Sequence, residues 1–286
     1  MEFSVKKIGN TFVGEVEGVD LSVDYDQDSV DAIRRALLKY KVLIFRGQRI
    51  SNQEHINFSQ KFGPSEYHSV TQYSHPQFPE ILVLSNRGGH GTKPIANGGS
   101  YWHSDMSYKT SPPLGSILYA LEVPPEGGET KFCDMAAAYE CLSNDIKQKV
   151  DGLYALHSYL PRFVASRKAD TEFQKNKFEL SDHQKSDFLE VAHPVVRTHP
   201  ENNCKALYVN EGFTIRIKGL VDKESKIILT KLYDCTTKEC FIYTHQWSIG
   251  DVVFWDNRST MHKACEYDQK YARRMQRTTI RGDAPI

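Results

Sequence analysis

The sequence contains no long hydrophobic run. Its wholly apolar stretches extend over only a few residues, whereas a membrane-spanning helix needs about 20 apolar residues. The first residues, Met1 to Lys7, are not followed by the apolar segment of a secretory signal. We therefore expect no membrane partner and a cytoplasmic location.

The sequence also lacks a surplus of charge of either sign. Its 36 Lys and Arg residues are balanced by 36 Asp and Glu residues, whereas proteins that bind nucleic acids generally need a basic surplus to displace counterions. This balance argues against a nucleic-acid partner. None of the six cysteines forms a C-x-x-C pair, and this pattern is typical of reduced thiols in the cytoplasm.

No repeat, low-complexity tract or Gly/Ser-rich linker divides the chain. Hydrophobic residues make up 40% of the 286 residues, which is ample for a packed core, and we predict a single domain over residues 1–286. Within it, the stretch from Phe163 to Leu189 is polar and charged, with scattered aromatic residues. Two interpretations of this stretch stay open, a solvated insertion and a lid over a pocket.

Two amphipathic helices are expected in the N-terminal part of the chain. The first begins at Asp28 or Ser29 and ends at Tyr40, because its apolar residues recur at helical spacing. The second covers about Ser51–Phe62. It opens with a capping box, since Glu54 follows its first residue by three positions.

Short apolar segments separated by turn residues dominate the rest of the chain. Two helices interrupt this series, at about Ala136–Gln148 and Lys223–Tyr233. Many short strands with few helices predict a mainly β fold with helical cover, such as a β-sandwich or jelly roll. The expected strands are Val42–Phe45, Ile81–Leu84, Ser116–Val123, Thr130–Cys133, Pro194–Thr198, Ala206–Val209, Glu239–Tyr243, Asp251–Phe254 and Met275–Ile280.

The motif Tyr101-Trp102-His103-Ser104-Asp105 is a candidate metal site. In an extended segment, residues i and i+2 point to the same face, so the imidazole of His103 and the carboxylate of Asp105 would converge. Nitrogen together with a hard oxygen suits the two-His, one-carboxylate sites of Fe(II) enzymes. Spacing alone does not choose the third ligand among the other histidines. His262 is the best candidate because of the residues that follow it. For an isolated H-x-D motif, a surface histidine is the simpler interpretation.

Arginines cluster just after His262. Arg273, Arg277 and Arg281 are spaced four apart, so in a strand they would share one face. The guanidinium group suits bidentate binding of a carboxylate or sulfonate. An isolated cluster of this kind is more simply a basic surface strand, but beside a metal site it indicates an anion-binding face.

Together these motifs resemble the taurine/2,4-dichlorophenoxyacetate dioxygenase family of Fe(II)- and 2-oxoglutarate-dependent enzymes. The resemblance covers nearly the whole chain, and the motifs follow one another in the family's order. They are Val42–Gln48, Phe62-Gly63-Pro64, Trp102–Asp105, Pro124–Thr130, Trp255–Arg258, His262 and the tail from Arg273 to Asp283.

The resemblance implies a double-stranded β-helix, or jelly roll, that binds Fe(II). His103, Asp105 and His262 would be the iron ligands, with 2-oxoglutarate as cosubstrate and O2 as oxidant. Halogenating relatives lack the carboxylate ligand. The presence of Asp105 therefore implies hydroxylation rather than halogenation.

The resemblance also implies how the two organic substrates are held. Arg273, eleven residues after His262, would bind the distal carboxylate of 2-oxoglutarate, and Thr130 would add a hydrogen bond. Arg277 matches the position that meets the anionic group of the prime substrate. His68, six residues after Phe62, matches the histidine that assists it.

The implied reaction is hydroxylation of a C–H bond in a small carboxylate- or sulfonate-bearing substrate, coupled to decarboxylation of 2-oxoglutarate to succinate and CO2. Taurine-cleaving members carry Asn where this chain has Gly99, and Phe132–Met135 resembles the aryloxyalkanoate branch, so an aryloxyalkanoate-like substrate is favoured. Taurine or another alkylsulfonate stays open, as does an amino-acid-like substrate of a biosynthetic hydroxylase or desaturase. A non-redox metal enzyme or a metal-binding sensor on the same barrel is the alternative from another class. Relatives often form dimers or tetramers, so a homo-oligomer is compatible with the resemblance.

Overall fold

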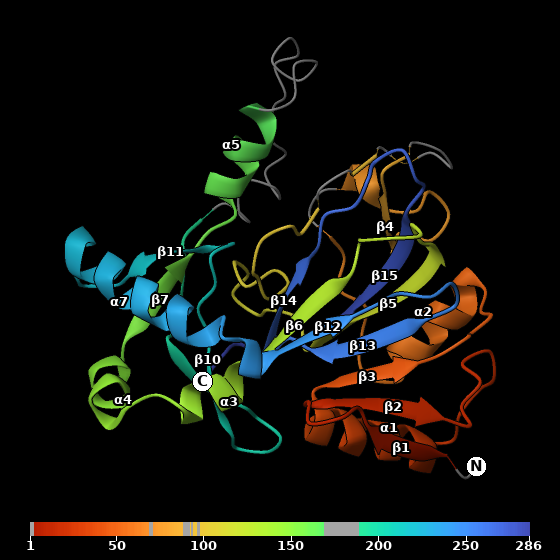
Figure 1. Ribbon diagram of the computed structural model, residues 1–286, viewed down its shortest axis with the longest axis horizontal. Coiled ribbons are helices and arrows are strands. Elements are labelled where there is room, and N and C mark those ends of the chain that lie inside the picture. Colours follow the sequence, from red (N-terminus) through yellow and green to blue (C-terminus); the bar gives the residue numbers. More distant parts are fainter. Residues whose placement is uncertain (1–2, 69–70, 88–91, 93, 96–97, 169–188) are drawn as a thin grey trace.

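The computed structural model of the chain describes residues 3–68, 71–87, 92, 94–95, 98–168 and 189–286 (Figure 1). The side chains of residues 165–168 are outside this description. Most of the predicted lid at 163–189 therefore lies outside the described residues. In the part of the chain that the structure describes, no helix is long and apolar enough to cross a membrane.

The structure is mostly β, as the sequence predicts, and its largest element is a seven-stranded sheet. Its neighbouring strands pair antiparallel, except that β2 and β3 run parallel. In sheet order the strands are β1 (Ser4–Lys7), β2 (Val13–Glu17), β3 (Val42–Phe45), β13 (Val252–Asp256), β5 (Gly115–Glu122), β15 (Arg274–Ile280) and β4 (Leu82–Ser85).

A second, three-stranded sheet lies against the large one (Figure 1). Its strands, in sheet order, are β12 (Ile242–His245), β6 (Thr130–Asp134) and β14 (Thr260–Ala264). Phe132 of β6 packs on Trp255 of β13, with ring centroids 5.6 Å apart, in a core cluster that also contains Met275 of β15. The inner faces of the two sheets therefore share one core.

Two helices, α1 (Gln27–Tyr40) and α2 (Asn52–Gln60), cover the other face of the large sheet (Figure 1). Successive side chains of a strand alternate between its faces. Phe254 accordingly points away from Trp255 and meets Phe62, just past α2, with ring centroids 4.9 Å apart.

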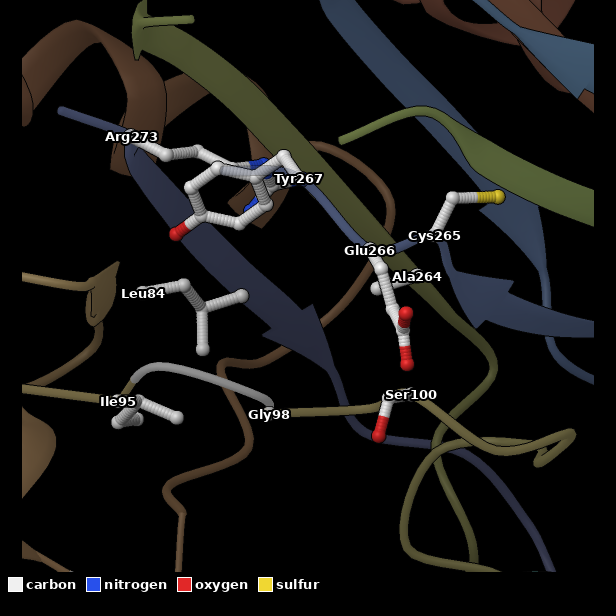
Figure 2. Close-up of a pocket in the computed structure, with 9 residues that line it drawn as sticks. All are labelled: Leu84, Ile95, Gly98, Ser100, Ala264, Cys265, Glu266, Tyr267 and Arg273. Carbon is white, nitrogen blue, oxygen red and sulfur yellow. The ribbon is translucent and has the colours of Figure 1, made fainter. Parts of the chain in front are cut away.

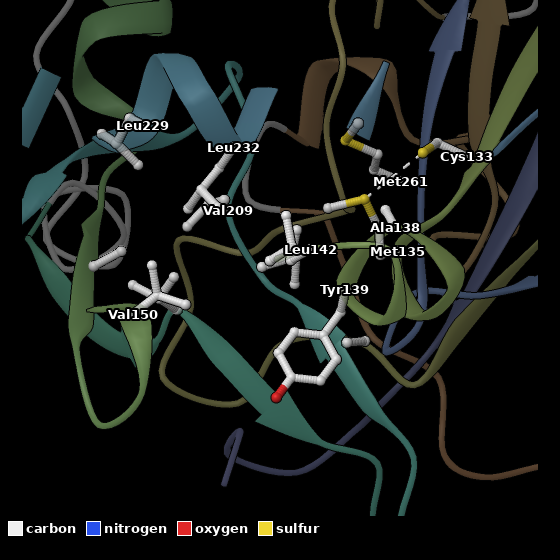
Figure 3. Packing of buried hydrophobic residues seen from close by; sticks show 14 of the residues in the cluster. Cys133, Met135, Ala138, Tyr139, Leu142, Val150, Val209, Leu229, Leu232 and Met261 are labelled. Atoms are coloured by element: carbon white, nitrogen blue, oxygen red, sulfur yellow. Dashed lines mark hydrogen bonds between the residues drawn. The ribbon is translucent and has the colours of Figure 1, made fainter. Parts of the chain in front are cut away.

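The small sheet is covered in turn by α3 (Met135–Glu140), α4 (Asn144–Val150) and α7 (Asp222–Thr236). Figure 3 shows this core, in which Met261 and Cys133 of the small sheet approach Met135 and the apolar side of α7. The remaining strands form two small sheets nearby. One is β11 (Thr214–Ile217), β7 (Tyr154–His157) and β8 (Val191–Pro194), and the other is β10 (Lys205–Leu207) and β9 (Val196–Thr198). The helix α5 (Leu160–Lys168) follows β7.

Several predicted boundaries were wrong, and each has a local cause. The first helix is capped by Asp26, whose side chain accepts from Ser29 N, so it begins earlier than predicted. The predicted helix Ala136–Gln148 is two helices, because a second N-cap at Ser143 starts α4. The predicted strand Glu239–Tyr243 begins as a 3-10 turn, and its β part is β12.

One predicted feature was confirmed, one predicted strand is divided, and five strands were not predicted. The capping box of α2 is present, as predicted. Pro194–Thr198 is divided between β8 and β9. Strands β1, β2, β7, β11 and β14 were not predicted.

The core between the large sheet and α2 predicts a large stability effect at Phe254, which is fully buried. Phe254→Ala should lower the free energy of unfolding by about 3–5 kcal/mol, because the cavity left by the ring stays unfilled. Ile249→Ala is the control, since Ile249 is 67% exposed, and it should change the value by less than about 0.5 kcal/mol. Urea unfolding followed by circular dichroism measures both. Equal effects of the two substitutions would contradict this packing.

Candidate active site

The two histidines and the aspartate predicted as ligands meet on one side of the small sheet. His103 and His262 form an antiparallel bridge, with His103 N donating to His262 O at 3.0 Å and His262 N donating to His103 O at 2.8 Å. The Nε2 atoms of both rings lie 3.9 Å from Asp105 Oδ1. One ligand atom from each of the three residues lies within 4.8 Å of the others. The triad predicted from sequence is therefore assembled in the structure.

The donor set fits a divalent iron ion. His103 Nδ1 is held by the carbonyl of Tyr101 at 2.8 Å, which leaves Nε2 facing the other two ligands and orients the ring as metal-bound histidines usually require. Burial lowers the pKa of both imidazoles, so the neutral, metal-binding form prevails at neutral pH. Two imidazole nitrogens with one carboxylate oxygen are the ligands of non-haem Fe(II) sites.

Asp105 is a buried charge with several compensating partners. Arg277 donates from Nη1 to Oδ1, and Ser116 Oγ donates to Oδ2 at 2.8 Å. Burial by itself would raise the pKa of this carboxyl. The Arg277 guanidinium, followed by the two imidazoles and the Ser116 hydroxyl, outweighs burial and holds the pKa well below its ordinary value. Asp105 is therefore ionised and able to serve as a ligand.

Asn257 holds this arrangement together, and its role was not predicted. Its Oδ1 accepts from Trp255 Nε1 at 3.0 Å and from Asp105 N at 3.3 Å. Its Nδ2 donates to Ser116 Oγ at 3.2 Å, and its carbonyl accepts from Ser104 Oγ at 2.8 Å. One amide thus links the strand β13, the metal motif and the strand β5. The only sequence signal was the motif Trp255–Arg258, which contains it.

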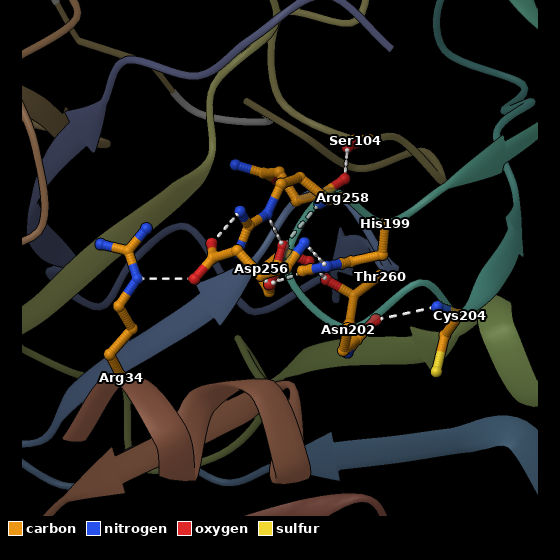
Figure 4. Close-up of polar contacts among 10 residues, drawn as sticks. Arg34, Ser104, His199, Asn202, Cys204, Asp256, Arg258 and Thr260 are labelled. Atoms are coloured by element: carbon orange, nitrogen blue, oxygen red, sulfur yellow. Dashed lines mark hydrogen bonds and ion pairs between the residues drawn. The ribbon is translucent and has the colours of Figure 1, made fainter. Parts of the chain in front are cut away.

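An ionic cluster with a buried centre, Asp256, Arg258 and His199, fixes the turn that carries Asn257 (Figure 4). Arg258 donates from Nε and Nη2 to Asp256 at 2.8 and 2.7 Å, and also binds Glu201 through Nη1. His199 Nε2 lies 2.9 Å from Asp256 Oδ2, and Arg34 reaches Glu201 at 2.6 Å. Burial opposes ionisation of Asp256, but Arg258 and His199 outweigh it and hold the pKa of this carboxyl low. The turn between β13 and β14 is therefore held on several sides.

Arg277 lies within β15, and Arg273 directly precedes that strand; Met275, between them in the sequence, packs in the core. Arg273 Nη2 donates to the carbonyl of Gly128 at 3.3 Å, and its guanidinium lies 5.8 Å from the Tyr267 ring centroid (Figure 2). Burial lowers the pKa of Arg273. Among the described residues, no ion pair joins Arg273 to a carboxylate. A half-buried cation without an acidic partner is suited to an anionic ligand.

The backbone beside Arg273 requires glycine. Gly128 has φ of +72°, and a Cβ there would lie 3.2 Å from Arg273 Nε. Gly99 has φ of +77°, and a Cβ there would lie 3.1 Å from His103 Cε1. Both positions therefore favour a residue without a side chain.

Thr130 and His68 were predicted to help bind 2-oxoglutarate and the prime substrate. Thr130 is buried at the start of β6, where its Oγ1 accepts from Trp247 Nε1 at 3.0 Å. His68 is half-buried in the segment after α2. Its role as a substrate-binding residue stays a prediction.

A family model described as "Taurine catabolism dioxygenase TauD, TfdA family" matches residues 4–279. The chain belongs to this family. Its relatives include the α-ketoglutarate-dependent 2,4-dichlorophenoxyacetate dioxygenase of Cupriavidus pinatubonensis, which is 33% identical over 96% of both chains. The α-ketoglutarate-dependent sulfate ester dioxygenase of Pseudomonas putida is 32% identical over 100% of this chain and 92% of its own length.

Solved structures agree with this family. The crystal structure of AAD-2 in complex with Mn(II) and N-oxalylglycine has a TM-score of 0.82 and 31% identity, and covers 100% of this chain and 99% of that one. A putative α-ketoglutarate-dependent taurine dioxygenase from Burkholderia xenovorans has a TM-score of 0.82 and 32% identity, with 100% and 94% coverage. The chain is therefore an oxidoreductase of the α-ketoglutarate (2-oxoglutarate)-dependent dioxygenase class, with Fe(II), 2-oxoglutarate and O2 as its cofactor and cosubstrates.

The contacts of Asn257 predict that it controls metal affinity. Asn257→Ala removes the amide that orients Asp105 and Ser116, and should weaken Mn(II) binding roughly 10- to 100-fold. Isothermal titration calorimetry measures this directly. Asn57→Ala, at an exposed position of α2, is the matched control and should leave the affinity unchanged. Wild-type affinity in a folded Asn257→Ala protein would contradict the positioning role.

Proposed function

We propose that this protein hydroxylates a C–H bond of a small anionic substrate and couples this step to decarboxylation of 2-oxoglutarate to succinate and CO2. The observation that carries the proposal is the buried guanidinium group of Arg277, which binds the carboxylate of Asp105 in the His103, Asp105 and His262 triad. Arg273, half-buried just before β15, has the Gly128 carbonyl as its only hydrogen-bond partner among the described residues. A metal would bind the triad, and two organic anions would bind the two arginines.

The triad would hold the iron. Bound there with 2-oxoglutarate and O2, iron supplies the oxidant for the substrate C–H bond. The protein supplies the three ligands and keeps them in place. The Tyr101 carbonyl fixes the ring of His103, and Ser116 and Asn257 fix the carboxylate of Asp105. Three ligands leave open positions on an octahedral metal for the cosubstrate and for O2.

Arg273 and Thr130 would bind the distal carboxylate of 2-oxoglutarate. Arg273 is half-buried, and its guanidinium reaches only a backbone oxygen, Gly128 O, among the hydrogen bonds of the described residues. A carboxylate there would form a charge-assisted, fork-like pair with it. This assignment comes from the family motif and is supported by the burial and charge of the site.

Arg277 and His68 would bind the anionic group of the prime substrate. Arg277 Nε is buried and has no hydrogen-bond partner in the described part of the chain, while Nη1 is bound to Asp105. An anion that took up the unused donors of Arg277 would be held next to the triad. Binding in this way would present the neighbouring carbon of the substrate to the oxidant.

The substrate class is an aryloxyalkanoate or a compound similar to it. Relatives bear the names 2,4-dichlorophenoxyacetate dioxygenase and (S)-phenoxypropionate/α-ketoglutarate-dioxygenase. A Cβ at Gly99, where taurine-cleaving members carry Asn, would lie 3.1 Å from His103 Cε1, so an amide side chain there would require the His103 ring to shift. An alkyl sulfate is the second candidate, because the sulfate ester dioxygenase is about as similar to this chain.

We further propose that residues 1–286 form one domain in which the large and small sheets make a double-stranded β-helix. The shared core of Phe132, Trp255 and Met275 supports this arrangement. The proposal also includes a lid around 163–189. It further includes a homo-oligomeric state, as a dimer or tetramer, and a cytoplasmic location. The family match favours a dioxygenase over the non-redox enzyme and the sensor.

Succinate formation tests the proposed function. Purified protein loaded with Fe(II) is given 2-oxoglutarate, O2 and, in turn, 2,4-dichlorophenoxyacetate, (S)-phenoxypropionate, an alkyl sulfate and taurine. An aryloxyalkanoate should give the highest rate. Alanine at His103, Asp105 or His262 should lower turnover roughly 100-fold or more, because the metal is lost.

The control is Asp145→Ala, which removes a carboxylate from the exposed side of α4 and should keep wild-type turnover. Full succinate formation in all three triad variants would contradict the assignment. No 2-oxoglutarate turnover in iron-loaded wild-type protein would contradict the function.

The two arginines should have separable effects. Arg273→Ala should raise the Kd of 2-oxoglutarate about 10- to 100-fold, because a charged hydrogen-bond donor is lost. Arg277→Ala should raise the KM of the prime substrate by a similar factor, while uncoupled 2-oxoglutarate decay persists. Arg281→Ala, at an exposed position just past β15, should change neither constant. Equal effects of Arg273→Ala and Arg277→Ala on both ligands would contradict this division.

A further inference from the structure

The indole of Trp247 makes a single directed contact with a proposed cosubstrate residue. Trp247 Nε1 donates to Thr130 Oγ1 at 3.0 Å. The two residues are far apart in the sequence. They meet because β12 pairs with β6, with His245 opposite Thr130, and Trp247 lies two residues past the end of β12.

This contact limits the orientations that the Thr130 hydroxyl proton can take. An indole N–H can only donate, whereas a threonine hydroxyl has one proton and two acceptor lone pairs. The Trp247 N–H therefore occupies one lone pair of Oγ1. Among the hydrogen bonds of the described residues, Thr130 Oγ1 donates to no protein group. The hydroxyl proton is thus available for an anion.

The loop that carries Trp247 is itself held rigidly. His245 packs edge-on against the Trp247 ring, with centroids 4.5 Å apart at 87°. Its Nε2 lies 3.2 Å from Oδ2 of the buried Asp251, which also accepts from Ser248 N at 2.9 Å and from Arg46 at 2.6 Å. Since an ionised carboxylate only accepts, His245 donates to it. The indole is therefore fixed from both sides.

Thr130 and Arg273 belong to one neighbourhood. The carbonyl that receives Arg273 belongs to Gly128, two residues before Thr130. Cys265 N donates to Glu129 O at 2.8 Å, and Ala264 lies opposite Thr130 in the sheet. The segment from Gly128 to Thr130 is therefore held between the Arg273 side chain and β14.

We propose that Trp247 is a positioning residue for the cosubstrate, which acts by holding the Thr130 hydroxyl so that its proton points at the distal carboxylate of 2-oxoglutarate. The inference rests on the proposed binding of 2-oxoglutarate at Arg273 and Thr130. Trp247 does not touch the cosubstrate in this account. Trp247 acts through Thr130 Oγ1 alone. Its effect is therefore limited to ligands that carry the distal carboxylate.

Binding without turnover tests the proposal. The Mn(II)-loaded protein is titrated with N-oxalylglycine and with 2-oxoglutarate in a calorimeter, under anaerobic conditions. Trp247→Phe keeps an aromatic ring against His245 but removes the N–H. It should weaken both ligands about 3- to 10-fold, as expected for one lost hydrogen bond. Its affinity for Mn(II) alone should equal that of the wild type.

A ligand control separates positioning from general damage. 2-Oxopentanoate has the keto acid of 2-oxoglutarate but no distal carboxylate, so Trp247→Phe and wild type should bind it equally. Thr130→Ser keeps the hydroxyl and should bind 2-oxoglutarate nearly as wild type. Thr130→Val should weaken 2-oxoglutarate, and adding Trp247→Phe to Thr130→Val should weaken it no further, because the two residues act through the same proton.

The outcomes are distinguishable. If wild-type protein with Mn(II) binds neither 2-oxoglutarate nor N-oxalylglycine, the proposed function fails. If wild type binds them and Trp247→Phe binds equally well, only the positioning role fails. Additive losses in the double variant, or an equal loss for 2-oxopentanoate, would also overturn the positioning role, because they would show a general structural effect.

Discussion

The burial of one carboxylate sets the requirements for the rest of the site. Asp105 is 2% exposed and lies between two buried imidazoles. An unpaired charge in such surroundings is costly, so each of its oxygens needs a partner. Arg277 and Ser116 provide them. A divalent metal would add the strongest positive charge, and the Asp105 carboxylate would then contact both the metal and Arg277.

The fold meets these requirements with elements that are distant in sequence. The large sheet supplies Ser116 from β5 and Arg277 from β15, while β14 of the small sheet supplies His262. Asn257, in the turn between β13 and β14, joins the metal motif to β5 by hydrogen bonds to Asp105 and Ser116. The buried residues Asp256, Arg258 and His199, together with the exposed Glu201, keep this turn in place. The position of the metal ligands is thus decided by the packing of two sheets and not by any one loop.

Much of this site could be predicted from sequence because its residues are close in the chain or regularly spaced. The H-x-D motif places two candidate ligands together, and the four-residue spacing predicts that Arg273 and Arg277 share one side of an extended segment, although β15 itself begins at Arg274. His262 needed the family motif, because nothing in its own spacing links it to Asp105. The strand that carries it, β14, was missed. Only two of its five residues, Met261 and Ala264, are apolar, and His262 and Lys263 interrupt the alternation that marks a half-buried strand.

The contacts that depend on tertiary structure could not be predicted. Asn257 resembles any polar turn residue until β5 and the metal motif close around it. Trp247 looks like an exposed loop aromatic, and only the pairing of β12 with β6 brings it to Thr130. The first helix began earlier than predicted because Asp26 and Asp28 are both acceptable caps by residue type. In each case local chemistry allowed several structures, and packing selected one.

The central claim is that the triad and Arg273 together bind a metal with 2-oxoglutarate chelated to it. The most direct measurement is an anaerobic optical titration of the protein, first with Fe(II) and then with 2-oxoglutarate. We expect a weak visible charge-transfer band that appears only when both are present and saturates at about one equivalent per chain, since the triad leaves two adjacent positions for the keto acid. Absence of the band, with iron demonstrably bound, would contradict the account.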